Sequence, residues 1–165
     1  MRPVSATTSI DVPRERVFEL LGDLSARPAF TDHFLSGFRL SRVDPSGVGA
    51  GARFQLHESG EWMDTVIEEV DPPHLLRERG HGGRLNRVPV LTVWELAEGP
   101  GAETCEVTVT FWTEPTTPVD RIRELIGASG WFERNWRRAL ARLKLVAEAG
   151  GPSERVVVAG ADRLP

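Results

Sequence analysis

The side chains in this sequence best suited to acid–base chemistry are two aspartates and a histidine. Asp32 and His33 are adjacent, and a carboxylate beside an imidazole can support proton transfer. Asp64 lies in a segment, residues 61–70, that is expected to form a strand. Burial there would raise its pKa and make it a proton carrier. These three are the catalytic candidates, the alternative for each is an exposed surface position, and whether the protein is an enzyme is left open.

The orientation of Asp64 depends on which side of its strand is apolar. One possible apolar face carries, together with Asp64, the side chains of Trp62, Val66 and Val70. The other carries Met63, Thr65 and Ile67, and it would turn Asp64 to solvent. A β-bulge within the strand would reconcile the two halves, so the pattern leaves both orientations open.

Several other chemistries lack their sequence requirements. The histidines, at positions 33, 57, 74 and 81, have no metal-binding spacing, and a single cysteine excludes an internal disulfide and a cysteine cluster. No serine nucleophile elbow is present. The glycine-rich residues 47–51 precede an expected strand, whereas a dinucleotide loop must open a helix. We therefore expect neither a metal nor a cofactor.

Composition and charge place the chain among ordinary globular domains. Its 165 residues are 40% hydrophobic and 27% charged, and no apolar run approaches the roughly 20 residues that span a bilayer. The first residues lack the apolar region of a signal peptide, so we expect a cytoplasmic protein without an integral membrane segment. Lys144 is the only lysine among 20 basic residues, which is typical of a GC-rich, bacterial genome.

The charge is unevenly distributed along the chain. The net charge is -4, but the segment 120–148 holds an excess of arginine and lysine. A basic helix can bind phosphates or an anionic membrane surface, but the more common role is the solvated face of an amphipathic helix. Because the whole chain is acidic and lacks a known nucleic-acid module, we expect no nucleic-acid partner.

The order of predicted elements begins with a strand and two short helices. Alternation over residues 4–12 predicts a strand, and Pro13 suits the first position of a helix that ends at Gly22. A second helix is expected over residues 28–35, because aromatic residues recur there at four-residue spacing and continue beyond it. The aromatic residues of this segment are Phe30, Phe34 and Phe38. We expect these three residues to lie at the mouth of a cavity. On this hypothesis Phe34→Ala should weaken ligand binding with little loss of stability.

Six further strands and a long helix complete the pattern. The strands are expected at residues 37–43, 52–58, 61–70, 75–80, 88–97 and 103–113. In the last of them apolar residues alternate with polar ones, so only one face of the sheet is apolar and needs a cover. The C-terminal helical segment, which follows Pro118, supplies it, and a break is expected within it at residues 127–130, before its aromatic residues. Its apolar stripe consists of Val119, Ile122, Ile126, Phe132, Trp136, Leu140, Leu143 and Ala147.

These elements and several short motifs resemble a known superfamily. The motifs include Val12-Pro13 before Val17-Phe18, the glycine turn at 47–51 and the strand Thr92-Val93-Trp94-Glu95-Leu96. In this order they resemble the START/Bet v1-like (SRPBCC) superfamily, near the polyketide cyclase/dehydrase and lipid-transport group. The resemblance implies an α+β helix-grip fold, in which a curved antiparallel sheet of about seven strands wraps around the long C-terminal helix. The domain is expected over residues 1–149, followed by a flexible tail, 150–165, whose valines could pair with a sheet edge.

The resemblance also implies an internal cavity for a small hydrophobic molecule. Candidate ligand-binding residues are Phe30, Phe34, Phe38, Phe54, Trp94, Phe111, Phe132 and Trp136. Binding or transport of a lipid, polyketide or terpenoid-like ligand is the first hypothesis. An aromatic polyketide cyclase or dehydratase acting in the same cavity is the second, and a protein-interaction module with a filled core is the third. We expect a monomer or a homodimer.

Overall fold

The protein is described here by a computed structural model that covers residues 1–101, 103–115 and 128–157. Short antiparallel strands alternate with three helices and two 3-10 turns in these residues. In chain order the elements are β1 (Val4–Ile10), α1 (Arg14–Gly22), η1 (Leu24–Ala26), α2 (Pro28–Thr31), β2 (Leu35–Leu40), β3 (Gly51–Leu56), β4 (Trp62–Asp71), β5 (Leu75–Gly82), η2 (Arg84–Asn86), β6 (Val88–Glu98), β7 (Cys105–Thr113) and α4 (Ala128–Glu148).

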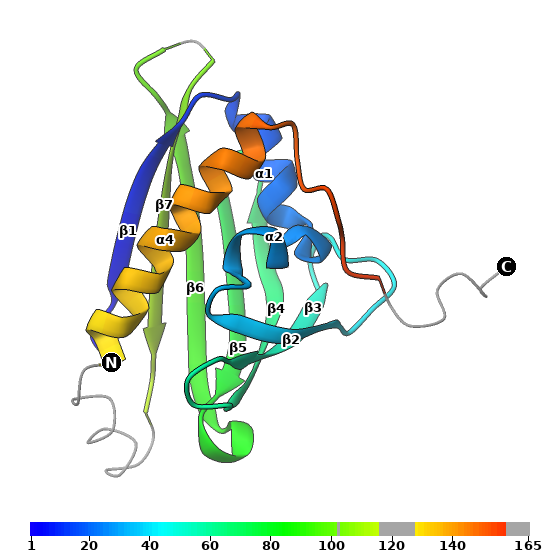
Figure 1. Cartoon of the computed structure of the whole chain (residues 1–165), viewed down its shortest axis with the longest axis vertical. Coiled ribbons are helices and arrows are strands. Elements are labelled where there is room, and N and C mark those ends of the chain that lie inside the picture. The colour runs from blue at the N-terminus through cyan, green and yellow to red at the C-terminus, as the bar shows by residue number, and fades with distance from the viewer. Residues whose placement is uncertain (102, 116–127, 158–165) are drawn as a thin grey trace, which may run out of the picture.

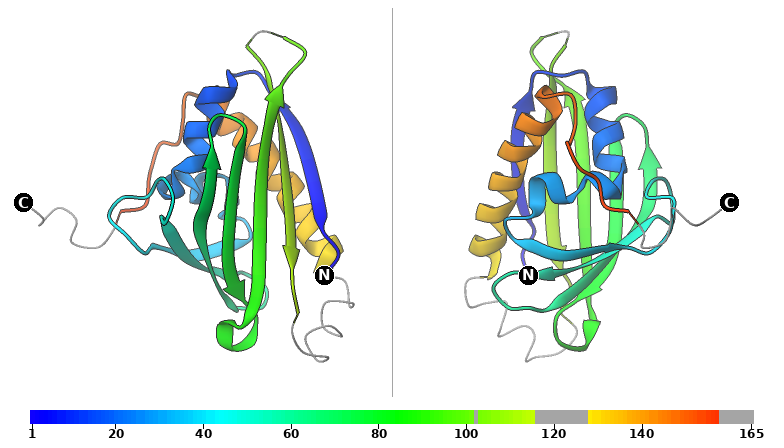
Figure 2. Two further views of the ribbon diagram at one scale, coloured as in Figure 1. Left: turned by 180° about the vertical axis from the view of Figure 1, so that it is seen from behind. Right: turned by 45° about the vertical axis from the view of Figure 1, so that its right-hand side comes forward.

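The strands form one antiparallel sheet that curls around α4. The order across the sheet is β1-β7-β6-β5-β4-β3-β2, so the first strand pairs with the last and the meander between them runs in chain order. Figure 1 and Figure 2 show α4 lying diagonally across the inner face of the sheet, with α1 and α2 on that same face. The structure confirms the predicted helix-grip architecture.

The alternation of β7 explains why one face of the sheet is covered. Cys105, Val107, Val109 and Phe111 are buried, whereas Glu106 is exposed and the threonines between them are half-buried. On the outer face the hydroxyls of Thr108 and Thr110 pair with those of Thr7 and Ser5 across the β1–β7 ladder. The apolar side chains of the inner face bury their surface against α4, as the sequence predicts.

The burial pattern of β4 settles the orientation of Asp64, which the sequence left open. Its buried positions are Met63, Thr65 and Ile67, and the pairing with β5 shifts register between Ile67 and Glu69. The second apolar face is therefore the inner one in the first half of the strand, and the irregularity falls where a bulge was considered. Gly80 of β5 allows close pairing here, since a Cβ atom there would lie 1.9 Å from the carbonyl oxygen of Asp64.

The helix α4 supplies the apolar stripe over its described length. Its buried residues are Phe132, Trp136, Ala139, Leu140, Leu143 and Ala147. Val119, Ile122 and Ile126, which the sequence analysis assigned to the same stripe, lie outside the described residues. Of the expected break at 127–130, residues 128–130 are helical, and position 127 lies outside the described residues.

The two short helices differ in detail from the prediction. Pro13 is the N-cap of α1 and not its first helical residue, and α1 ends at Gly22 as expected. The helix α2 spans only Pro28–Thr31, because the chain turns after it and enters β2. Phe34 therefore lies in the turn and Phe38 on a strand, so the four-residue spacing of the aromatics does not reflect one helix.

The chain after α4 lies along the outside of η1. The backbone N–H of Val156 donates to the carbonyl of Ser25 at 3.0 Å, and Arg155 forms an ion pair with Asp23. Within its described part, up to residue 157, the tail therefore contacts a helical turn and not a sheet edge. Among the described helices, none combines the length and the apolar composition that crossing a membrane requires.

Candidate functional site

A narrow cavity lies between the curled sheet, the α2–β2 segment and α4. Its free space measures about 20 Å³, which is room for about one water molecule. Aromatic and aliphatic side chains form most of its wall, and polar groups are few. The lining residues are Arg27, Phe34, Leu35, Phe38, Phe54, Leu56, Met63, Asp64, Thr65, Glu78, Val90, Thr92, Phe111, Phe132 and Trp136.

An arginine between η1 and α2 provides the positive charge of this cavity. The side chain of Asp23 caps η1 by accepting from the backbone N–H of Ser25 at 2.9 Å, which fixes the turn that precedes Arg27. The hydroxyl of Thr31 donates to the carbonyl of Arg27 at 2.9 Å. With its backbone held on both sides, Arg27 extends into the core, where its side chain is only 4% exposed.

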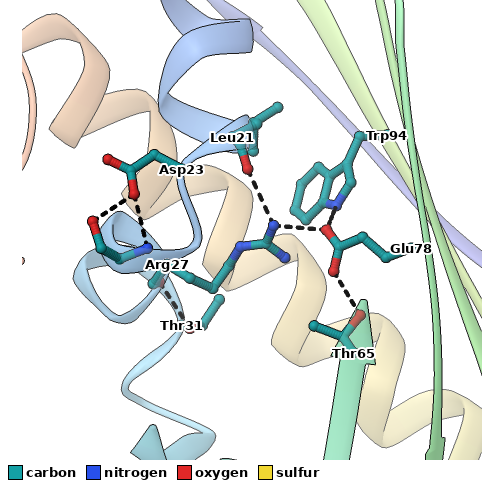
Figure 3. A network of polar contacts seen from close by, with 8 residues as sticks. Leu21, Asp23, Arg27, Thr31, Thr65, Glu78 and Trp94 are labelled. Atoms are coloured by element: carbon teal, nitrogen blue, oxygen red, sulfur yellow. Dashed lines mark hydrogen bonds and ion pairs between the residues drawn. The ribbon is translucent and has the colours of Figure 1, made fainter. Parts of the chain in front are cut away.

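A glutamate on β5 faces this arginine. The Nη2 atom of Arg27 donates to Oε1 of Glu78 at 2.6 Å and to the carbonyl of Leu21 at 3.2 Å. Oε1 also accepts from Nε1 of Trp94 at 2.9 Å, and Oε2 accepts from the hydroxyl of Thr65 at 2.9 Å. Figure 3 shows the carboxylate between these three side chains, which come from the η1–α2 junction, β6 and β4. We call Arg27, Thr65, Glu78 and Trp94 the buried polar network.

The buried polar network is charge-balanced and shielded from water. Glu78 is 2% exposed, so each charge depends on the other for compensation. The guanidinium carbon of Arg27 also lies 5.1 Å from the ring centroid of Trp94 and 5.7 Å from that of Phe30. Cation–π contacts and hydrogen bonds to both carboxylate oxygens offset part of the cost of burying two charges.

Aromatic rings make up much of the remaining wall. The ring of Trp136 lies between three others, with centroid distances of 5.3 Å to Phe34, 5.5 Å to Trp94 and 5.8 Å to Phe111. On the β2–β3 side, Phe38 and Phe54 stack at 5.6 Å. The cavity therefore has a polar end at the buried polar network and an aromatic body, which is the usual design of a site for an apolar molecule with few polar groups.

Comparison with known families agrees with this architecture. The profile of the family described as polyketide cyclase / dehydrase and lipid transport matches residues 1–148. The chain belongs to this family. The match confirms the group named from the sequence motifs. No curated protein sequence matches the chain.

Several solved structures share this fold. The Zhui aromatase/cyclase of a Streptomyces species is 20% identical, with a TM-score of 0.66 over 92% of this chain and 99% of that one. DynU16, a protein in the dynemicin biosynthetic locus, is 24% identical with a TM-score of 0.60, and the match covers 93% of this chain but only 50% of DynU16. A hypothetical protein of Helicobacter pylori is 12% identical, with a TM-score of 0.69 over 88% of each chain. At these identities the likeness establishes the fold alone.

Most of the aromatic residues predicted to bind ligand border the cavity. The lining includes Phe34, Phe38, Phe54, Phe111, Phe132 and Trp136. Phe30 and Trp94 are not among the lining residues, and both are fully buried beside the guanidinium of Arg27. Ligand contact by these residues stays a prediction. The expectation that Phe34 is a peripheral roof residue is wrong, since it is 1% exposed.

Asp64 borders the cavity, but its carboxylate has other partners. It alternates with the buried Met63 and Thr65, which places the side chain on the outer face of β4. There Oδ1 accepts from the backbone N–H of His81 at 2.7 Å, and Oδ2 accepts from Nδ2 of Asn86 at 2.5 Å. The carboxylate of Asp64 therefore does not point inward, as a desolvated proton carrier would require.

The side chains of His33 and Asp32 each have a partner on α4 and do not form a hydrogen-bonded pair with one another. Nε2 of His33 donates to the carbonyl of Asn135 at 3.2 Å, and Asp32 forms an ion pair with Arg142 at 2.5 Å. Burial, followed by the charges of Arg138 and Arg142, lowers the pKa of His33 from its usual 6.5, against the opposing effect of the Asn135 hydrogen bond. Neither residue lines the cavity. A catalytic role of any of the three candidates stays untested.

Of the residues at the polar end, only Trp94 is among those predicted from the sequence. Arg27, Thr65 and Glu78 were not assigned to the site, although one signal was present. In β5 Glu78 alternates in phase with Leu76, whose side chain is buried, so an acid on the apolar face could have been recognised. Arg27 lies in a turn without periodicity, and only the tertiary contact with Glu78 identifies it.

Proposed function

We propose that this protein binds a small hydrophobic molecule, such as a lipid, a polyketide or a terpenoid, in the cavity between the sheet and α4. The observation that carries the proposal is the composition of the wall, an aromatic body closed at one end by the buried polar network. Few polar groups at a fixed place, within an otherwise apolar wall, suit an apolar ligand with one polar end. The family assignment supports the same class of ligand.

Binding requires the cavity to expand. The free space of about 20 Å³ holds no organic ligand. Phe38 and Leu56 border the cavity and are only partly buried, unlike Phe34 and Trp136. We therefore assign entry to the β2–β3 side, where side chains can move at the smallest cost in buried apolar area.

Native mass spectrometry of the purified protein, followed by denaturing extraction, tests the proposal. We expect a co-purifying apolar molecule, or saturable uptake of an added one. The variant Thr92→Phe fills the cavity from β6 and should abolish uptake, whereas Thr110→Phe, on the outer face of β7, should leave it unchanged. Circular dichroism checks that both variants fold, and Val90→Leu offers a smaller filling change. Equal uptake by the filled variant would contradict the proposal.

A polyketide cyclase or dehydratase is the second candidate function. One observation favours it, namely that a charged pair and a hydroxyl, Arg27, Glu78 and Thr65, line the cavity and not merely apolar groups. Such groups can orient a reactive chain and hold its carbonyls, which is a large part of cyclisation. Incubation with a linear poly-keto thioester distinguishes the candidates, because a cyclase converts it into an aromatic product with loss of water, whereas a carrier returns it unchanged.

A further inference from the structure

The exposed arginines on the outer face of the sheet, which the left view of Figure 2 shows, fall into two groups. On β5, Arg77 and Arg79 each form an ion pair with a glutamate of β4. Arg39 of β2 and Arg53 of β3 are also exposed, but within the part of the chain that the structure describes neither forms an ion pair. The positive charge of the second group is therefore not balanced by a bound carboxylate.

The two arginines of the second group lie directly opposite each other. Arg39 and Arg53 are register partners in the β2–β3 ladder, so their side chains leave the sheet side by side. Like charges at such positions repel each other, and an anion between them would remove this cost. On its other side Arg53 faces Asp64 of β4. The carboxylate of Asp64 accepts hydrogen bonds from the backbone of His81 and from Asn86, so it is already engaged elsewhere.

The ring of Trp62 brings the two guanidinium groups together. Trp62 is the first residue of β4, and its indole extends across β3, since Cη2 lies 3.7 Å from the position of a Cβ atom at Gly37 of β2. The guanidinium carbons of Arg53 and Arg39 lie 4.8 Å and 5.5 Å from the ring centroid. Both cations thus converge on one half-buried ring, which restricts their side chains without neutralising their charge.

This arrangement limits the chemistry of a ligand. An arginine fork donates two parallel hydrogen bonds to a carboxylate or a phosphate. A phosphate monoester near neutral pH carries about two negative charges and three free oxygens, so it matches two forks in charge and in acceptors. A carboxylate or a phosphate diester carries a single charge and leaves one arginine uncompensated.

We propose that Arg39 and Arg53, held on the ring of Trp62, form a surface site for the phosphate monoester group of a ligand. The site lies on the outer face of strands whose inner face borders the cavity, so it does not depend on the proposed function. The chemistry that it recognises is a terminal phosphate, which belongs either to a soluble phosphorylated molecule or to a lipid headgroup such as that of phosphatidic acid.

Nuclear magnetic resonance of the full-length protein tests the site. The indole N–H signal of Trp62, identified by its loss in Trp62→Phe, is followed during titration with glycerol 3-phosphate at constant ionic strength. We expect a saturable shift with a Kd on the order of a millimolar, whereas acetate and glycerol should bind at least about tenfold more weakly. If acetate binds as tightly as glycerol 3-phosphate, the site does not select a phosphate monoester and the inference is overturned.

Two pairs of substitutions assign the effect to these arginines. Arg39→Gln combined with Arg53→Gln should weaken binding of glycerol 3-phosphate at least about tenfold, and Arg53→Lys, which keeps the charge but removes the fork, about threefold. Arg77→Gln combined with Arg79→Gln is the matched control, because it removes the same charge from the same face of the sheet. Circular dichroism checks the fold of each variant. An equal loss of binding in the control would show a general effect of net charge and would contradict the site.

Vesicles distinguish the two sources of the phosphate. The protein is sedimented with phosphatidylcholine vesicles that contain phosphatidic acid or, at equal surface charge, phosphatidylserine. Selective binding to phosphatidic acid that requires both arginines identifies a lipid headgroup as the ligand. Binding of glycerol 3-phosphate without this selectivity identifies a soluble ligand. If the wild-type protein shows neither response, or binds both anionic vesicles equally without binding glycerol 3-phosphate, the inference is overturned.

Discussion

The two faces of β5 carry the same kind of interaction in opposite environments. Inward, Glu78 pairs with Arg27, and the two side chains are 2% and 4% exposed. Outward, Arg77 pairs with Glu69 and Arg79 with Glu68, and all four are between 41% and 49% exposed. The inner pair and the closer outer pair have nearly the same N–O distance, 2.6 Å and 2.5 Å. What distinguishes the contribution of the two pairs to stability is therefore their exposure to solvent and not their distance.

The energetic consequence follows from solvation. Water screens the outer pairs and solvates either partner if the other is lost, so each contributes little. Glu78 and Arg27 are almost completely removed from bulk solvent, so loss of one leaves an uncompensated charge in the core. The inner pair is therefore costly to break, and it also fixes the polar end of the cavity.

Breaking the inner pair should have the largest effect. Arg27→Met leaves Glu78 charged and buried, and the free energy of unfolding should fall by about 3–5 kcal/mol. The double variant Arg27→Met with Glu78→Leu removes both charges and should recover most of that loss. Urea unfolding measures both. A double variant that is no more stable than the single one would contradict the contrast between the faces.

Removal of a ring from the aromatic wall of the cavity should have the second largest effect on stability. Phe34→Ala removes a fully buried ring that contacts Trp131 and Trp136, so stability should fall by about 3 kcal/mol. This reverses the expectation from the sequence, in which Phe34 was peripheral. Thermal unfolding measures the change, and Val43→Ala, at an exposed apolar position, is a control expected to be neutral. If Phe34→Ala is as stable as the wild type, Phe34 is not a core residue and the original prediction of a position at the cavity mouth stands.

His33, half-buried in the turn after α2, should add a pH dependence to the stability. Burial lowers the pKa of His33 by more than the hydrogen bond to the carbonyl of Asn135 raises it, so the folded protein favours the neutral ring. The unfolded chain takes up a proton first as the pH falls, and stability is therefore lost below about pH 6.5. Melting temperatures of wild type and His33→Gln, compared between about pH 8 and pH 5, should converge toward low pH. Parallel curves would exclude His33 as the cause.

Breaking an ion pair on the outer face of β5 should have the smallest effect on the free energy of unfolding. Arg77→Ala leaves an exposed Glu69, and the loss should be between zero and about 1 kcal/mol, decreasing as salt is added. Chemical denaturation at low and high ionic strength measures it. A loss as large as that of Arg27→Met would remove the contrast on which the comparison depends.

The fold could be predicted because its signals are local. Alternation in β7 and the apolar stripe of α4 each identify an element and its buried face without knowledge of the rest of the chain. The order of the elements then leaves few ways to cover a one-sided sheet, and the helix-grip arrangement is one of them. Local pattern was less reliable at β4, where two apolar faces were possible and the burial of Met63, Thr65 and Ile67 decided between them.

The site could be predicted only where it coincides with the core. Aromatic residues such as Phe111 and Trp136 were selected because apolar side chains on an inner face must line whatever lies between sheet and helix. The polar end was missed, because an arginine in a turn has no periodic pattern, and a glutamate in phase with the buried Leu76 does not by itself identify a partner. Nothing in residues 27 and 78 separately indicates that a contact across 51 positions removes both from water.

The sequence by itself determined most of the elements, the buried faces of those with a regular pattern, such as β7 and α4, and the family of this protein, since these depend on periodicities of a few residues. The tertiary structure alone decided which polar groups became internal. Burial of a charge depends on a partner brought from a distant segment, as with Arg27 and Glu78, and on the walls that exclude water around the pair. Those contacts arise only when the sheet has curled around α4.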